Sequence, residues 1–390
     1  MPPSHRTSSH LTAQVTSPGG PCAERFPQVR LDAANAIPIP GHPRLTRPEL
    51  AAIALRQGGL VTRDQARSAG YRGPEVRQLT SVGGLWLVVR HGVYVEREGW
   101  EAASEQTRWR LRDRAAHMST TVAHELSFDS AARLHGLPLV MVKRDLSHVT
   151  RPDVLGSRTE HGIKHHRGPA RSAGLPTVDG MPVTPPARTA VDLAREHGLS
   201  TGVAACDAVL RAGVRRSALK AQLRTMRHWP GVVAARAAVE LADPRAENAG
   251  ESLARLLVLE LGIGEVEPQF ALDLGGRTVW VDLRVGCHGF EFDGRLKYRP
   301  PAQGGVALRS AEEVVWAERQ REREICAVGL GMSRITWDDL FGVARARTKD
   351  RLLAEYAVTA RRFGTRLPEH LAAYSRAHSH DRLPGRRRAS

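Results

Sequence analysis

Apolar and polar residues alternate along the C-terminal half of the chain in a pattern that predicts three consecutive β-strands. Apolar residues occupy every second position across residues 270–274 and again across residues 279–285, with Gly275-Gly276 between the two runs. Two glycines between runs of period two indicate a β-hairpin with a two-residue turn. A second turn, centred on Cys287-His288, leads into the run GFEFD. The pattern therefore predicts an antiparallel meander.

The predicted pairing gathers acidic side chains on one face of this meander. The first turn sets Gln269 opposite Asp282. The second turn sets Arg284 opposite Glu291, and by the same register Asp282 lies opposite Asp293. Side chains that face each other across an antiparallel pair are about 5 Å apart, and like charges there are destabilising. The acidic face therefore requires compensation.

Three kinds of compensation remain open for this face. Arg284 and Lys297 can pair with the acids on a solvated sheet surface, or a carboxylate pKa can rise. Alternatively a divalent cation such as Mg²⁺ or Mn²⁺ fits, because oxygen-rich clusters are its usual ligands. The helix predicted to begin at residue 250 carries a further carboxylate, Glu251. The leucine stripe of that helix packs on a sheet and so brings Glu251 to the acidic edge.

Residues 46–100 predict a winged helix. Three short helices are followed by two apolar runs within residues 85–95, which predict a hairpin. The second helix begins with a capping-box pattern formed by Thr62 and Gln65. The third helix runs from residue 73 to about residue 82.

A winged helix places its third helix in the major groove of double-stranded DNA. Side chains of that helix contact bases or phosphates, and the hairpin turn forms the tip of the wing. The alternative is a protein-docking module whose polar residues are simply solvated. The candidate DNA contacts are Arg72, Arg77, Gln78 and Ser81 on the third helix, with Arg90 and His91 at the wing tip.

Residues 101–230 predict an α/β middle domain. An amphipathic helix opens this region, and the stretch LSHVTRP predicts a strand. His165 and His166 lie in the basic stretch HGIKHHRG, which predicts a solvated loop. Asp192 and Asp207 lie in helical, alanine-rich surroundings, so we expect structural roles for both.

The end of the chain predicts a helix at residues 311–327 and then the strand SRITW, which completes a mixed sheet. Glu318 and Arg321 share one face of that helix, where an exposed ion pair is the simplest interpretation. Residues 1–45 lack periodicity and predict a disordered extension. Residues 366–390 predict a basic disordered tail that binds nucleic acid nonspecifically.

Composition narrows the classes of function. Among 390 residues, 57 are Lys or Arg and 41 are Asp or Glu, and the resulting net charge of +16 favours a polyanionic partner. The four cysteines are widely spaced, which argues against a disulfide framework or zinc cluster and favours a reducing cytoplasm. No apolar run is long enough to predict a membrane span. The sequence also lacks the glycine-rich and nucleophile-elbow motifs of ATPases, dehydrogenases and serine hydrolases.

Two stretches in the first half of the chain resemble a known family. The segment LVTRDQARSAGYRGPEVRQLTSVGGLWLVVRHGVYV resembles the N-terminal domain of AbiEi-type antitoxins from type IV toxin–antitoxin systems. The segment MPVTPPARTAVDLAREHGL resembles their middle domain. The resemblance implies a transcriptional regulator that binds double-stranded DNA, with a cognate toxin as partner by analogy.

The acidic meander resembles a second family, the very-short-patch-repair-like branch of the PD-(D/E)xK nucleases. Its ordered set of polar residues and the later helix ERQRE carry this resemblance. By position, the resemblance makes Glu251, Asp282 and Glu291 ligands of Mg²⁺ or Mn²⁺. It makes Gln269 a supporting residue and sets Glu318 and Arg321 beside the active edge. The family's lysine two residues after the second acid is Asp293 here, and the nearest lysine is Lys297.

Together these patterns predict an α+β multidomain protein. A winged helix is followed by an α/β middle domain and, at residues 243–345, by a restriction-endonuclease-like mixed sheet with flanking helices. Two functions remain open. The first is a DNA-binding, antitoxin-type regulator that retains a nuclease fold, which Asp293 in the lysine position favours. The second is an active Mg²⁺-dependent DNA endonuclease in which Lys297 assists.

Overall fold

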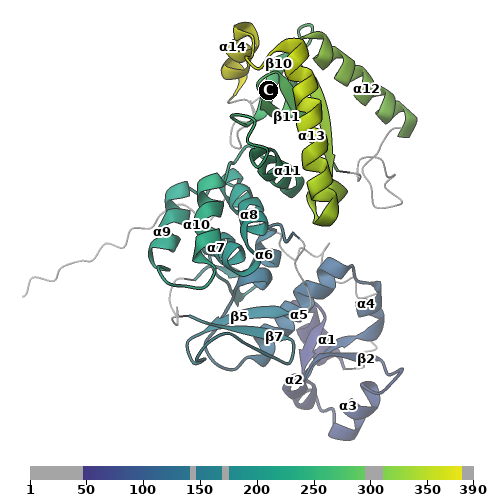
Figure 1. Cartoon of the computed structure of the whole chain (residues 1–390). Coiled ribbons are helices and arrows are strands. Elements are labelled where there is room, and N and C mark those ends of the chain that lie inside the picture. Colours follow the sequence, from purple (N-terminus) through teal and green to yellow (C-terminus); the bar gives the residue numbers. More distant parts are fainter. Residues whose placement is uncertain (1–46, 141–145, 169–174, 295–310, 380–390) are drawn as a thin grey trace, which may run out of the picture.

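The structure, a computed structural model, describes residues 47–140, 146–168, 175–294 and 311–379. The described chain is a mixed α+β protein with several small sheets. Figure 1 shows the N-terminal region at one end, a helical region in the middle and the C-terminal sheet at the other end. No helix in the described ranges has both the length and the apolar character needed to cross a membrane.

The N-terminal region combines three helices with a small antiparallel sheet. The sheet has the strand order β1-β3-β2. The predicted capping box is present, because the Thr62 hydroxyl accepts from the Gln65 backbone and the Gln65 side chain accepts from the Thr62 backbone. The elements are α1 (Pro48–Arg56), β1 (Leu60–Thr62), α2 (Arg63–Ser68), α3 (Gly73–Leu79), β2 (Trp86–Arg90) and β3 (Val93–Glu96).

Helix α3 is shorter than predicted. It ends at Leu79, and Thr80 caps it by donating its hydroxyl to the Val76 carbonyl at 2.8 Å. Ser81 therefore lies beyond the helix, where its hydroxyl bonds the Gln78 carbonyl at 2.7 Å. Polar side chains that bond the preceding turn in this way compete with continuation of the helix.

A second sheet follows, with the order β4-β5-β7-β6 and a parallel β5–β7 pair. The prediction of a solvated loop at His165 and His166 is wrong, because both residues are buried in strand β7. The ring of His166 stacks on Phe128 and lies 3.1 Å from His148, which accounts for its burial. The elements are α4 (Arg97–Ala102), α5 (Glu105–Ser119), β4 (Glu125–Leu126), α6 (Phe128–His135), β5 (Ser147–Arg151), β6 (Arg158–Glu160), β7 (Ile163–Arg167), β8 (Thr177–Val178) and β9 (Met181–Pro182).

Four helices complete the middle of the chain and share one apolar core with the first helix of the next region. Asp192 and Asp207 are fully buried among them and pair with arginines, as structural acids do. The helices are α7 (Pro186–His197), α8 (Leu199–Arg211), α9 (Arg216–Arg224) and α10 (Val232–Leu241).

The C-terminal region contains the predicted meander and mixed sheet. The strand order is β10-β11-β12-β13, with β12 and β13 parallel. The predicted Phe270–Val281 pair is confirmed. The elements are α11 (Ala249–Leu259), β10 (Glu267–Asp273), β11 (Thr278–Val285), β12 (His288–Asp293), α12 (Ala311–Ala327), β13 (Gly331–Thr336), the short 3₁₀ helix Asp338–Leu340, α13 (Gly342–Phe363) and α14 (Glu369–His378).

The register after the second turn differs from the prediction by two residues. Arg284 lies opposite Gly289 rather than opposite Glu291. The turn consists of Gly286 and Cys287, and Gly286 takes the left-handed φ of 56° that this tight turn requires. An even shift keeps every side chain on its predicted face. Continuing the observed register places Asp282 opposite Glu291 instead of opposite Asp293.

The prediction of a disordered tail from residue 366 is also wrong over much of its length. Residues 369–378 form helix α14, which packs on β10 with Leu371 buried. The hydroxyl groups of Tyr374 and Thr278 share a hydrogen bond of 2.6 Å. Residues 380–390 and the predicted N-terminal extension lie outside the described residues.

Candidate functional site

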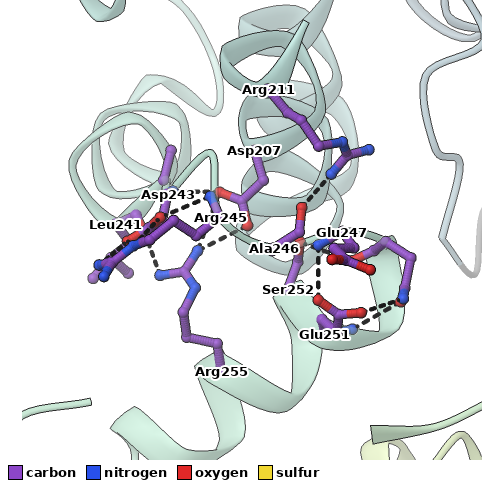
Figure 2. Close-up of polar contacts among 12 residues, drawn as sticks. Asp207, Arg211, Leu241, Asp243, Arg245, Ala246, Glu247, Glu251, Ser252 and Arg255 are labelled. Atoms are coloured by element: carbon purple, nitrogen blue, oxygen red, sulfur yellow. Dashed lines mark hydrogen bonds and ion pairs between the residues drawn. The ribbon is translucent and has the colours of Figure 1, made fainter. Parts of the chain in front are cut away.

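The start of helix α11 fixes the carboxylate of Glu251. Asn248 caps the helix, since its side-chain oxygen accepts from the Glu251 backbone at 3.0 Å. The amide nitrogen of Asn248 in turn donates to Glu251 Oε1 at 2.6 Å. The backbone N–H of Glu247 donates to Glu251 Oε2 at 2.7 Å (Figure 2). Donors at a helix N-terminus stabilise negative charge, and these three contacts hold the Glu251 side chain in a fixed position.

One turn later, Arg255 anchors the helix to the preceding region. Its Nη2 lies 2.8 Å from Oδ2 of Asp207 on α8, and its Nη1 donates to the Leu241 carbonyl at 2.6 Å (Figure 2). Asp207 also accepts from the Asp243 backbone at 2.6 Å. Burial raises the pKa of Asp207 against the opposing effect of Arg255. This network sets where Glu251 points relative to the sheet.

Helix α11 also approaches the sheet very closely. A Cβ atom added to Gly250 would lie 2.0 Å from the ring of Phe292 on β12. Only glycine permits this approach without displacement of the ring. The packing brings the beginning of α11, and with it Glu251, against the sheet as the sequence predicts.

Gln269 reaches Glu251 from strand β10. Its Nε2 donates to Glu251 Oε2 at 3.2 Å, and the side chain is buried. The residue takes a left-handed φ of 52° between the regular pairs Pro268–Leu283 and Phe270–Val281. Such a conformation costs about 1–3 kcal/mol in a residue other than glycine and is typical of functional positions. The distortion serves to direct the amide toward Glu251.

The environment of Glu251 raises the pKa of its carboxyl group to about 7. Burial is the largest cause, and the negative charge of Asp282 adds to it. Hydrogen bonds from Glu247 and Gln269 act in the opposite direction. The structure therefore brings Glu251 and Asp282 close enough for each carboxylate to oppose ionisation of the other.

Glu291 and Asp293, on the same face, each lie near an arginine of the protein. Glu291 Oε1 lies 2.7 Å from Nη2 of Arg321 on α12. Asp293 Oδ2 lies 3.9 Å from Nη1 of Arg334 on β13. Asp282 Oδ2 accepts from the Phe292 backbone at 2.9 Å. Arg321 thus contacts the acidic edge directly, from the helix where the sequence predicts it.

The sequence predicts Arg284 and Lys297 as partners of the acids. Arg284 is not a partner of Glu291, because it pairs with Glu267 on β10 and its guanidinium lies 4.9 Å from the centre of the Phe270 ring. The two-residue change of register moves it away from Glu291. Lys297 and the side chain of Glu318 lie outside the described residues.

The residues as placed do not fit the predicted metal centre. Among the side chains that the structure describes, no group of three or more His, Cys, Asp and Glu is arranged to hold a metal ion. Glu251 and Asp282 supply two carboxylates, whereas the third expected ligand, Glu291, is directed to Arg321. A divalent cation would therefore meet two of its three expected ligands and a competing guanidinium.

The candidate DNA contacts on α3 are all exposed. Arg72 caps the helix and has a side chain that is 85% exposed, with Nε 3.7 Å from Glu75. Arg77 and Gln78 project from the helix, and Ser81 follows two residues after its end. These four residues are all exposed and lie within ten positions of the chain.

The β2–β3 turn, predicted as the tip of a wing, contacts the middle region. Arg90 donates from both terminal nitrogens to the carbonyl of His161 in the β6–β7 turn, at 2.8 Å for Nη1. Burial lowers the pKa of Arg90. Arg90 therefore joins the hairpin to the middle region, while His91 is exposed.

A cavity of about 630 Å³ in the middle region is absent from the sequence prediction. Arg188 and Arg195 of α7 line it, and their separation by seven residues places them on one helix face. The seven-residue spacing of the two arginines is visible in the sequence. Because the surroundings are rich in alanine, the sequence predicted only a structural role for the neighbouring Asp192.

The chain is similar to two uncharacterized proteins of Mycobacterium tuberculosis, from two strains. Each is 36% identical over 134 residues, which make up 34% of this chain and 48% of the relative. The chain thus spans about half the length of the curated relatives it matches. No family model matches the sequence.

Proposed function

We propose that the protein is a DNA-binding transcriptional regulator of the antitoxin type. The N-terminal region supports this proposal through its element order, α1-β1-α2-α3-β2-β3, and its antiparallel sheet of order β1-β3-β2. This is the order expected of a winged helix, in which α3 is the recognition helix. The observation that carries the proposal is the group of exposed side chains at α3, and the net charge of +16 favours a polyanionic partner.

The C-terminal region enters the proposal as a nuclease-type domain that contributes to DNA binding. The support for this part of the proposal is the meander flanked by α11 and α12. The pair Arg321–Glu291 neutralises an acid that hydrolysis would assign to metal binding, and Arg334 lies 3.9 Å from Asp293, which stands in the lysine position. A cognate toxin belongs to the proposal by resemblance alone.

The test is DNA binding by the full chain. A preferred duplex is first selected from a random pool, and its affinity is then measured by fluorescence anisotropy. Arg77→Ala is expected to weaken binding by about 5- to 150-fold, which corresponds to about 1–3 kcal/mol for a base contact. Arg224→Ala, at an exposed position on α9, is the matched control and is expected to leave the affinity unchanged. Equal affinities for both variants and the wild type would reject the proposal.

One observation favours a second candidate, a Mg²⁺-dependent DNA endonuclease. Burial first and the negative charge of Asp282 second raise the Glu251 pKa, and a divalent cation would relieve the repulsion between the two carboxylates. Plasmid nicking and calorimetry with Mg²⁺ or Mn²⁺ test it. Nicking that requires the metal and disappears in Asp282→Ala would establish the enzyme. DNA binding without nicking, unaffected by that substitution, would support the regulator.

A further inference from the structure

The cavity in the middle region lies between the carboxyl ends of the parallel strands β5 and β7, helix α7 and the segment before α10. Its volume of about 630 Å³ lies in the range of small-molecule sites. The residues that define its chemistry are Phe128, His166, Arg167, Arg188, Arg195 and Trp229. None of them belongs to the acidic face or to the α3 surface, so the cavity requires an explanation of its own.

The wall formed by α7 carries an excess of positive charge. Arg188 Nε and Arg195 Nη1 lie 2.5 Å and 2.7 Å from the two oxygens of the fully buried Asp192. One carboxylate therefore orients two guanidinium groups. Arg167 adds a third at the end of β7, and Glu196 at the rim is already paired with Lys164. The cavity lining therefore has a net positive charge that an anion would neutralise.

The two guanidinium groups on α7 are held in fixed positions. Arg188 lines the cavity, is only 4% exposed and donates through Nε to Asp192, so its guanidinium is fixed at the cavity wall. The guanidinium carbons of Arg188 and Arg195 lie 5.1 Å and 4.7 Å from the centre of the Trp229 ring. Oriented, partly dehydrated guanidinium groups bind phosphate through paired hydrogen bonds.

Two neutral rings, those of Phe128 and His166, form another part of the lining, next to Arg167. The rings of Phe128 and His166 stack at 3.7 Å with an interplanar angle of 15°. His166 Nε2 is 3.1 Å from His148 Nδ1, and burial lowers the pKa of His166 to about 3, so the imidazole is neutral at pH 7. Phe128 takes a left-handed φ of 47°, a strained conformation that places its ring at this wall. Flat neutral surfaces suit an aromatic ring.

We infer that this cavity binds a small phosphate ester of a planar ring, the chemical class of the nucleoside monophosphates. The phosphate lies against Arg167, Arg188 and Arg195, and the ring lies beside the stacked pair of Phe128 and His166. A backbone phosphate of duplex DNA is the other source of the same chemistry. The burial of Arg188 favours a small molecule, because a stiff DNA duplex cannot enter the cavity far enough to reach this side chain.

The test uses the full chain in titration calorimetry with three kinds of probe. These are the 5′-monophosphates of adenosine, guanosine, cytidine and uridine, the parent nucleosides, and inorganic phosphate. At least one monophosphate is expected to bind at least tenfold more tightly than its nucleoside and than inorganic phosphate. No binding of any monophosphate, or equal binding of the nucleoside or of phosphate alone, would overturn the inference.

Variants locate the site and separate the two sources of phosphate. Arg195→Gln and Arg167→Gln are each expected to weaken monophosphate binding by about tenfold, whereas Arg224→Gln is expected to leave it unchanged. Arg167 is exposed at the end of a strand, so its variant keeps the test valid if Arg195→Gln does not fold. Unchanged binding in Arg167→Gln and in folded Arg195→Gln would overturn the inference. Duplex DNA that displaces the nucleotide and loses affinity in the same variants would assign the cavity to DNA and also overturn it.

Discussion

The surface at α3 and the acidic face of the C-terminal sheet are both candidate sites, and they differ in what their side chains do within the protein. At α3, Arg77 and Gln78 project into solvent. On the acidic face, Glu251 is held by Asn248 and Gln269, and Glu291 is paired with Arg321. Substitutions on the acidic face should therefore change mainly the stability of the protein. Substitutions at α3 should change mainly the binding of a partner.

The largest expected effect is the loss of the anchor beneath the acidic face. Arg255→Ala leaves the buried Asp207 without its cation, and breaking a buried pair in this way costs about 3–5 kcal/mol. Urea denaturation followed by circular dichroism measures this loss in the free energy of unfolding. Arg77→Ala is expected to change stability by less than about 0.5 kcal/mol. Similar losses in the two variants would erase the contrast between the regions.

The next effect is a pH dependence that belongs to Glu251. Its pKa is about 7 in the folded protein against an ordinary value of 4.5, so the folded protein keeps a proton that the unfolded chain releases between these values. The free energy of unfolding therefore falls as pH rises from about 4.5 to about 7, by on the order of 3 kcal/mol. Glu251→Gln is expected to remove this slope, while Glu98→Gln, at an exposed position, retains it. A slope unchanged in Glu251→Gln would contradict the assigned environment.

The smallest effect concerns Arg321. Its ion pair with Glu291 is partly exposed, so Arg321→Gln is expected to lower stability by no more than about 1 kcal/mol. The variant leaves Glu291 without this guanidinium, and Mg²⁺ is then expected to raise the melting temperature more than it does in the wild type. Arg319→Gln on the same helix is the matched control. An equal response to Mg²⁺ in the two variants would show that Arg321 does not compete with a cation.

Local patterns predicted the elements well where the signal lies within a few residues. The capping box at Thr62 and the hairpin at Gly275-Gly276 both formed as expected, because neighbouring residues determine them. The turn before β12 lies one residue earlier than predicted, which changes the register by two residues, and an even shift leaves the alternation of apolar positions unchanged. The hydrophobic pattern alone therefore fixes the face but not the register.

Features that depend on distant contacts were not predicted. His166 is buried because Phe128, 38 positions earlier in the chain, stacks on it. Helix α14 forms in a basic stretch because Leu371 packs against the sheet. Arg90 is directed to His161 across two regions. The acidic set was predicted from its strand pattern, but its pairing with Arg321 depends on how α12 lies on the sheet.

The most direct measurement compares the two regions in one DNA-binding assay. Arg77→Ala and Asp282→Ala are titrated against the selected duplex by fluorescence anisotropy, at equal salt and without divalent cations. We expect Arg77→Ala to lose about tenfold or more in affinity and Asp282→Ala to bind as the wild type does. Full affinity in Arg77→Ala together with a loss in Asp282→Ala would contradict a regulator that recognises DNA through α3.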